Sequence, residues 1–286
     1  MLPNGILAAA ITPRRGLSID VPAMIDLIQF LASKGASGIV LFGSTGEFVH
    51  FDLEARVEAT REIIRNAPVP VLVNASHSTL EGTIDLARRA LADGASAAVA
   101  MPPYYFRYNQ PQLRDFYMRL GEAVEGPLSL YNIPIFTSEL SRETAKELLA
   151  QGRFCALKDS SGDDSYLESL LGASSAKLYV GNDPSYRKLK SLGIDGAVSG
   201  IASAAPDLMV AIDSGDETRV AAAERLLHEF LSWFKKFPIP AAISQALEVR
   251  CGFPCPSATP LDPKLQQQFR AWVKEWIQEI ERQCKT

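Results

Sequence analysis

The sequence has few of the residues that build disulfide scaffolds or metal centres. It contains 4 cysteines among 286 residues, too few for the disulfide framework of a small secreted domain. The histidines, His50, His77 and His228, are scattered and do not have the spacing of metal ligands. Cys251 and Cys255 lie close together, but no second pair accompanies them. We therefore expect reduced cysteines, no metal site and a cytoplasmic protein.

The chain also lacks long apolar runs and clusters of basic residues. A membrane-spanning helix needs about 20 apolar residues, and no run in this sequence approaches that length. No basic segment precedes the short apolar stretch at residues 6–11, which argues against a signal peptide. The net charge is -4, so nothing in the charge balance favours binding to nucleic acid. We expect neither a membrane nor nucleic acid as a partner.

Short apolar runs recur along the chain, and each is followed by turn residues and a helical pattern. The runs do not alternate between polar and apolar residues, which is typical of parallel strands covered on both faces by helices. They occupy residues 5–12, 38–42, 69–74, 97–101, 128–132, 154–158, 178–180 and 196–199. Helices are predicted over residues 20–35, 53–64, 79–91, 112–124, 142–149, 166–171 and 184–192.

This succession of strand–helix units favours an α/β fold, a closed (β/α)8 TIM barrel. A doubly wound open sheet is the alternative, but it usually has fewer strands and often a glycine fingerprint, which is missing here. Residues 217–237, 241–250 and 263–281 also have helical patterns, more than one barrel helix requires. We predict a barrel over residues 1–215 and a C-terminal helical extension over residues 216–286. Together they would form one structural unit, with the extension packed on the barrel or on a neighbouring subunit.

One lysine stands at the end of the sixth apolar run. Lys158 follows residues 154–157, so it would lie at the carboxyl end of a strand, where the active sites of (β/α)8 barrels are found. A strand-end lysine ordinarily extends its amine to solvent. Burial, however, disfavours the ammonium form, and a neutral amine is a nucleophile that condenses with ketones. The residues that end the other strands decide between these two interpretations.

Polar residues with matching chemistry end several other strands. The turn at residues 43–47, Gly-Ser-Thr-Gly-Glu, exposes amides and hydroxyls that suit a carboxylate or phosphate, and it lacks the lysine of a P-loop. Tyr104 and Tyr105 follow the fourth run, and Tyr131 lies in the fifth. Each feature alone is more often a turn or a packing residue. Together with Lys158 they predict a ketone-binding site, with amides for a carboxylate and a phenol to carry protons.

The same motifs occur in the order and spacing of the dihydrodipicolinate synthase / N-acetylneuraminate lyase family, which the sequence resembles over nearly its whole length. They are GSTGE at residues 43–47, PYY at 103–105, YNIP at 131–134 and LKD at 157–159. Singly each motif is weak, but the set is highly specific. The resemblance implies a (β/α)8 barrel, a homotetramer built as a dimer of dimers, and class I aldolase chemistry. In that chemistry pyruvate forms a Schiff base with a lysine, and no cofactor is needed.

The resemblance also implies a role for each matching residue. Lys158 is expected to form the Schiff base, and Tyr131 to act as the proton relay. Ser44 and Thr45 are expected to hold the pyruvate carboxylate, and Ser44 to connect Tyr131 with Tyr105. As the second tyrosine of its pair, Tyr105 is expected to reach the site of an adjacent subunit. The positions that match residues lining the pyruvate pocket are Gly181 and Val198.

Two departures from the family pattern concern the second substrate. In the dihydrodipicolinate synthases an arginine shortly after the YNxP motif binds the carboxylate of aspartate semialdehyde, and here that position is Phe136. A phenyl ring cannot make this contact, which argues against lysine biosynthesis unless Arg107 or Arg142 substitutes. The sialic acid lyases carry an acidic pair after the strand-seven glycine. Here Pro184 replaces the second acid beside Asp183, so sialic acid is disfavoured.

The segment KDSSGD at residues 158–163 resembles more closely the 2-keto-3-deoxy sugar acid aldolases and the 4-hydroxy-2-oxoglutarate aldolases. We therefore predict reversible cleavage of a 2-oxo-4-hydroxy acid to pyruvate and an aldehyde, with Phe136, Ser160 and Asp183 around the second substrate. The alternatives are 4-hydroxy-tetrahydrodipicolinate synthase, a 2-oxo acid dehydratase that uses the same imine, and a pyruvate-binding barrel without turnover. The sequence does not identify the aldehyde.

Overall fold

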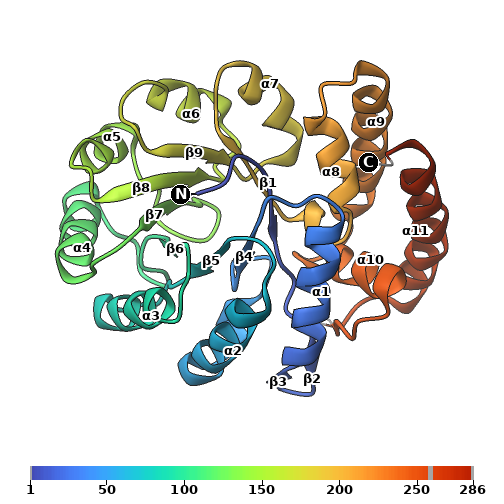
Figure 1. The fold of residues 1–286 in the computed structure, drawn as a ribbon, viewed down its shortest axis with the longest axis horizontal. Helices are drawn as coiled ribbons and strands as arrows, with labels where there is room; N and C mark the ends of the chain where they lie inside the picture. Colours follow the sequence, from blue (N-terminus) through green and yellow to red (C-terminus); the bar gives the residue numbers. More distant parts are fainter. Residues whose placement is uncertain (1, 257–259, 285–286) are drawn as a thin grey trace. The chain divides into compact units, whose positions relative to one another are not determined.

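The computed structural model describes residues 2–256 and 260–284, and Figure 1 shows its elements. The strands of the main sheet are β1 (Gly5–Ala9), β4 (Gly38–Leu41), β5 (Val71–Asn74), β6 (Ala97–Ala100), β7 (Leu128–Asn132), β8 (Phe154–Asp159), β9 (Lys177–Val180) and β10 (Gly196–Ser199). They form a closed barrel in the order β1-β10-β9-β8-β7-β6-β5-β4. Nearly all of their residues are buried, as expected for parallel strands covered on both faces. The predicted (β/α)8 barrel is confirmed.

A helix follows each barrel strand. These helices are α1 (Val21–Ser33), α2 (Leu53–Asn66), α3 (Leu80–Ala92), α4 (Gln110–Ala123), α5 (Arg142–Ala150), α6 (Asp164–Leu170), α7 (Tyr186–Ser191) and α8 (Pro206–Asp213). Short 3-10 helices are η1 (Phe48–His50), η2 (Asp183–Ser185) and η3 (Ile201–Ser203). The chain ends with α9 (Glu217–Phe234), α10 (Ala241–Cys251) and α11 (Pro263–Gln283). Across residues 2–256 and 260–284, no helix combines the length and the apolar character needed to cross a membrane.

Several elements differ from the sequence prediction. Helix α8 was missed because most of its residues are buried, so its sequence has no polar stripe that would reveal a helical period. The predicted helix over residues 184–192 is divided between η2 and α7. A small antiparallel hairpin of β2 (Arg14–Arg15) and β3 (Ser18–Ile19) was also missed, since two-residue strands are too short to show a period.

The chain divides into two compact units. The first comprises residues 1–4 and 70–198, and the second comprises residues 5–69 and 199–286. In the first unit, helices α3 to α6 lie outside strands β5 to β8 (Figure 1). The second unit holds β1, β4 and the C-terminal helices. The predicted division of the chain at residue 215 falls inside the second unit and stays a prediction.

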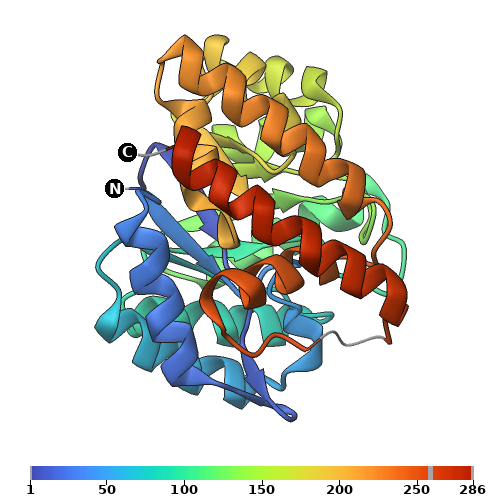
Figure 2. The same ribbon diagram turned by 90° about the vertical axis from the view of Figure 1, so that its right-hand side faces the viewer.

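Within the second unit, the C-terminal helices pack on the last barrel helix. Helix α9 packs against α8, and α11 runs beside α9 (Figure 2). Arg250 of α10 binds the carboxylate of Asp207 of α8 with both terminal nitrogens, at 2.8 and 2.6 Å, and both side chains are buried. Arg250 also donates to the Ala204 carbonyl at 3.0 Å. This bidentate geometry compensates the two charges for their loss of water and ties the extension to α8.

Candidate active site

Lys158 and Tyr131 lie side by side on adjacent strands of the first unit. In the parallel pairing of β7 with β8, Tyr131 is the partner of Lys158. Only 9% of the Lys158 surface and 4% of the Tyr131 surface are exposed. The Lys158 Nζ atom lies 4.3 Å from the centre of the Tyr131 ring. The amine therefore does not extend to solvent, and an aromatic face shields it on one side.

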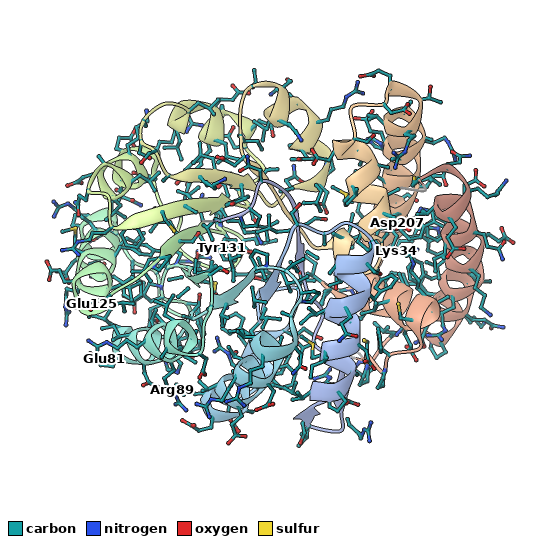
Figure 3. All side chains as sticks on the ribbon, in the orientation of Figure 1. Lys34, Glu81, Arg89, Glu125, Tyr131 and Asp207 are labelled. Carbon is teal, nitrogen blue, oxygen red and sulfur yellow. The ribbon has the colours of Figure 1, made fainter. Side chains whose placement is uncertain are left out.

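Figure 3 shows the setting of this pair within the first unit. Tyr131 lies among the strands, whereas Glu81 and Glu125 lie among the outer helices. Both acidic residues are exposed. The arrangement follows the usual division of a barrel, in which charged residues gather on the helical exterior and the strands form the buried interior.

Gly181, directly after β9, leaves room for the Lys158 side chain. A Cβ atom at this position would lie 2.8 Å from Lys158 Cε and 2.0 Å from Ser160 Oγ, which is closer than real Cβ contacts. The backbone of Gly181 is not in the left-handed region, so glycine is required here for space alone. The same geometry places the Ser160 hydroxyl close to the end of the lysine side chain.

Ser44 and Thr45 belong to the second unit and follow β4 in a strained turn. Phe42, with φ 54, and Glu47, with φ 51, flank them in the left-handed region, which costs free energy in residues other than glycine. A Cβ atom at Gly200 would lie 3.2 Å from the Thr45 hydroxyl oxygen. Strain of this kind often accompanies functional turns. The predicted roles of the two hydroxyl residues beside the lysine stay predictions.

The other predicted site residues lie in the first unit, in different surroundings. Tyr105 is 86% exposed, has φ 86 and packs edge-on against Phe106 with ring centres 5.0 Å apart. Within one chain it is therefore not part of the buried group. Phe136 is 47% exposed and lies between β7 and α5. Asp183, which begins η2, and Val198 of β10 are both buried.

The two arginines that could replace the missing carboxylate ligand are engaged within the protein. Arg107 donates a hydrogen bond to the main-chain carbonyl of Thr137. Arg142 forms an ion pair with Asp163 at 2.5 Å and donates to the Ser165 hydroxyl at 2.6 Å. A second-substrate carboxylate would have to compete with these acceptors for either guanidinium.

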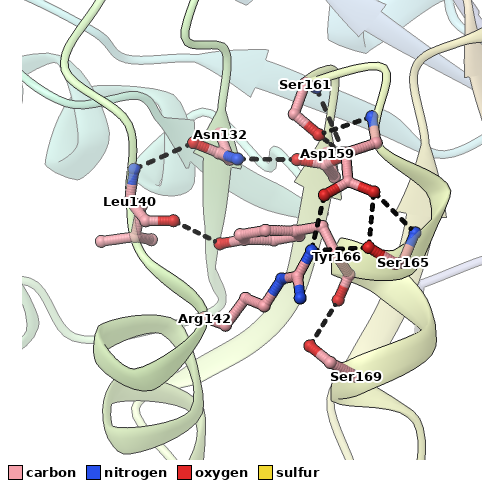
Figure 4. A network of polar contacts seen from close by, with 9 residues as sticks. Asn132, Leu140, Arg142, Asp159, Ser161, Ser165, Tyr166 and Ser169 are labelled. Atoms are coloured by element: carbon pink, nitrogen blue, oxygen red, sulfur yellow. Dashed lines mark hydrogen bonds and ion pairs between the residues drawn. The ribbon is translucent and has the colours of Figure 1, made fainter.

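A buried polar pair beside Tyr131 and Lys158 was not among the predicted site residues. Asn132 and Asp159 are the next residues on β7 and β8, and the Asn132 amide donates to Asp159 Oδ1 at 2.7 Å (Figure 4). Burial raises the pKa of the Asp159 carboxyl, and hydrogen bonds from Ser161 and Asn132 act in the opposite direction. Polar residues at two strand ends, each next to a predicted catalytic residue, are the sequence signal that could have identified them.

The cysteines behave as buried thiols. Cys255 and Cys284 are buried, and Cys155 and Cys251 are partly buried, all as free thiols. Burial raises the pKa of Cys255 to about 12 and that of Cys251 to about 11, so these groups are protonated and unreactive at neutral pH. In the part of the chain that the structure describes, no three His, Cys, Asp or Glu side chains gather as metal ligands would.

Known proteins of one family are similar to this chain over most of its length. The model described as the dihydrodipicolinate synthetase family matches residues 2–278. The 4-hydroxy-tetrahydrodipicolinate synthase of Nitrosospira multiformis is 30% identical over 286 residues, covering 95% of this chain and 95% of that protein. A probable 2-dehydro-3-deoxy-D-pentonate aldolase of Escherichia coli is 30% identical over 210 residues, covering 70% of each chain.

A solved structure extends the similarity to three dimensions. It is a prophage protein of the dihydrodipicolinic acid synthase family from E. coli K12, in complex with pyruvate. It matches with a TM-score of 0.87 and 26% identity, over 97% of this chain and 99% of that one. The fold, the motifs and the relatives agree, and the chain belongs to the dihydrodipicolinate synthetase family.

Proposed function

We propose that this protein is a class I pyruvate aldolase that reversibly cleaves a 2-oxo-4-hydroxy acid to pyruvate and an uncharged aldehyde. The observation that carries the proposal is the buried Lys158 amine, held 4.3 Å above the ring of Tyr131. Membership of a family whose relatives include a named aldolase supports the reaction class. Such a reaction requires a nucleophilic amine and an acid–base group, and the adjacent Lys158 amine and Tyr131 phenol support these two assignments.

In the cleavage direction, Lys158 Nζ attacks the C2 carbonyl and water leaves, which forms an iminium. The iminium accepts the electron pair of the C3–C4 bond while Tyr131 takes the proton of the C4 hydroxyl, and the aldehyde departs. The enamine that remains takes a proton at C3, and hydrolysis then releases pyruvate and the Lys158 amine. Ser44 and Thr45 hold the pyruvate carboxylate through hydroxyls and turn amides, and Gly181 and Val198 line the pocket.

Tyr105 serves, in this proposal, the site of an adjacent subunit. Its side chain is almost fully exposed and its backbone is left-handed, a strain that persists mainly where it has a use. Ser44 then connects Tyr131 with the Tyr105 of a neighbouring subunit, in a homotetramer built as a dimer of dimers. Free thiols fit a reducing compartment, and we assign the enzyme to the cytoplasm.

The surroundings of the second substrate favour an uncharged polyhydroxy aldehyde. Phe136 stands where a carboxylate ligand would be needed, and Arg107 and Arg142 are already bound to protein acceptors. Asp183 adds a buried carboxylate after β9, which would repel a carboxylate on the aldehyde and accept hydrogen bonds from its hydroxyls. The Ser160 hydroxyl beside Lys158 is a further partner for a substrate hydroxyl. The 2-keto-3-deoxy sugar acids have this chemistry, whereas 4-hydroxy-2-oxoglutarate and aspartate semialdehyde bring a second carboxylate.

A panel of aldehydes tests the substrate class. With pyruvate, glycolaldehyde and glyceraldehyde are expected to condense with a kcat/KM at least about tenfold higher than glyoxylate or aspartate semialdehyde, because a carboxylate without a cationic partner is costly to bury. Phe136→Arg is expected to shift this ratio toward the carboxylated aldehydes. A preference of the native protein for aspartate semialdehyde would instead identify a 4-hydroxy-tetrahydrodipicolinate synthase.

Reduction with borohydride in the presence of pyruvate tests the reaction class. Peptide mass mapping is expected to find one reduced pyruvyl adduct, on Lys158. An adduct elsewhere, or none, contradicts the mechanism. Release of pyruvate from 2-keto-3-deoxy sugar acids, coupled to lactate dehydrogenase, distinguishes an aldolase from a barrel that binds pyruvate without turnover.

Gly181→Ala tests the space that the lysine requires. The added methyl group would overlap Lys158 Cε and Ser160 Oγ, and a displacement of about 1 Å can cost on the order of 10²-fold in rate. We therefore expect kcat to fall by about 10²-fold. Gly121→Ala on α4 is the matched control, because its nearest side-chain atom would lie at an ordinary 3.4 Å. Equal kcat values in the two variants would show that Lys158 does not depend on this space.

A further inference from the structure

We propose that Asn132 and Asp159 are positioning residues that hold Tyr131 and Lys158 in register. The inference rests on the proposed function, because it concerns the geometry of the same two reacting groups. Tyr131 pairs with Lys158, and Asn132 pairs with Asp159, as successive positions of the β7–β8 ladder. Neighbouring residues of a strand point to opposite faces. The side chains of Asn132 and Asp159 therefore lie on the opposite face of the sheet from those of Tyr131 and Lys158, on the same two strands.

Each side-chain nitrogen and oxygen of Asn132 and Asp159 has a defined hydrogen-bond partner, as Figure 4 shows. Asn132 Nδ2 donates to Asp159 Oδ1 at 2.7 Å, and Asn132 Oδ1 accepts from the Leu140 main-chain N–H at 3.0 Å. Asp159 Oδ2 accepts from the Ser161 hydroxyl at 2.7 Å and from its N–H at 3.3 Å. Rotating the Asn132 amide by half a turn would place its NH₂ group opposite the Leu140 N–H and its oxygen opposite the Asp159 carboxylate. The orientation of Asn132 is therefore unique.

The main chain of the same two residues holds the neighbours of the reacting lysine. The Ser160 N–H donates to the Asn132 carbonyl at 2.8 Å, and the Gly181 N–H donates to the Asp159 carbonyl at 2.6 Å. Ser160 and Gly181 lie near the end of the Lys158 side chain, since a Cβ atom at Gly181 would meet both Ser160 Oγ and Lys158 Cε. A shift of β7 against β8 would therefore displace the Tyr131 phenol relative to the Lys158 amine. It would also disturb Ser160 and Gly181.

The pair also anchors the loop that carries Phe136. Leu140 ends that loop, and while its N–H binds Asn132, its carbonyl accepts from the Tyr166 hydroxyl at 2.8 Å. Burial, with a smaller contribution from the charge of Asp159, raises the pKa of Tyr166, so the phenol stays a donor at every physiological pH. The Asn132–Asp159 pair thus connects the Schiff-base strand with the loop expected to contact the second substrate.

A reciprocal exchange of the two side chains tests the proposal. Asn132→Asp alone sets two carboxylates against each other, and Asp159→Asn alone leaves a donor facing a donor. We expect either change to lower kcat by about 10²-fold, with little change in KM for the 2-oxo acid, because misplacement acts on the reacting atoms. In the double variant, Asn132→Asp with Asp159→Asn, the amide at 159 donates to the carboxylate at 132 and still accepts from Ser161. We expect it to recover most of the lost kcat.

Melting temperatures and a neighbouring variant separate positioning from stability. All rates are measured well below the unfolding midpoint, and Asp163→Asn is the control, since it weakens the exposed ion pair with Arg142 in the same network. We expect this control to keep its kcat. Single variants that have a lower melting temperature but the native kcat would overturn the proposal. So would a folded double variant that stays as slow as the single ones.

The remaining outcomes are also decisive. If a single variant does not fold, the double variant still decides. A double variant that folds and has most of the native kcat supports the proposal, and one that folds but lacks this activity contradicts it. Borohydride trapping of the native protein is run in parallel. A native protein that gives no pyruvyl adduct on Lys158 overturns both the proposed function and the inference. If the native protein gives the pyruvyl adduct on Lys158 but the single variants have the same kcat as the native protein, the inference alone is overturned.

Discussion

Lys158→Arg is expected to abolish turnover and to leave no pyruvyl adduct after borohydride reduction. The guanidinium keeps a positive charge of similar reach, but it stays protonated under all working conditions and cannot condense with a ketone. Arginine therefore keeps a long basic side chain at position 158 while the nucleophile is lost. The measurements are kcat for pyruvate release and the mass of the peptide that contains position 158.

A second strand lysine provides the matched control. Lys177 begins β9, is partly exposed and lies 3.5 Å from Asp195, so it has an ion-pair partner and stands at the opposite end of a barrel strand from Lys158. Lys177→Arg is expected to keep both the adduct and the turnover. An adduct that persists in Lys158→Arg would show that another amine forms the imine.

Tyr131→Phe is expected to lower kcat by about 10²–10⁴-fold, the usual contribution of a positioned acid–base group. The ring that packs over the Lys158 amine remains, so the change removes the hydroxyl and preserves the aromatic wall. We expect the melting temperature to change little. Turnover close to that of the native protein would show that another group carries the proton.

A buried tyrosine outside the site separates a catalytic loss from a structural one. Tyr117 of α4 is fully buried, and its hydroxyl donates to the Ala100 carbonyl at 3.2 Å. Tyr117→Phe is expected to lower the free energy of unfolding by about 1 kcal/mol, the typical contribution of one hydrogen bond. It should leave kcat unchanged, the reverse of the result expected for Tyr131→Phe.

The barrel strands of this protein could be predicted because they are buried on both faces and therefore read as short apolar runs. β7 and β10 have the predicted bounds, and each of the other barrel strands differs from its predicted range at one end. Helix α8 could not be found in the same way. Its sequence has no exposed polar stripe, and a helix without such a stripe has no amphipathic period to detect.

The candidate site likewise contains residues that the sequence could identify and residues that it could not. Lys158 and Tyr131 could be selected from their places at strand ends within a set of motifs. Asn132 and Asp159 were in the same motifs, but they are 27 residues apart in sequence, and only the β7–β8 pairing makes them partners. The need for glycine at position 181 was equally hidden, because the atoms that exclude a side chain there belong to Lys158 of β8 and to Ser160 directly after it.

The sequence by itself determined the α/β class, the strand–helix order, the family resemblance and the lysine to which the chemistry is assigned. These depend on local periodicity and on motifs, which are properties of contiguous residues. Only the tertiary structure decided that the Lys158 amine lies buried over the Tyr131 ring, and that Arg107 and Arg142 are bound to protein acceptors. The environment of a side chain is set by groups from distant segments, and strand pairing decides which segments those are.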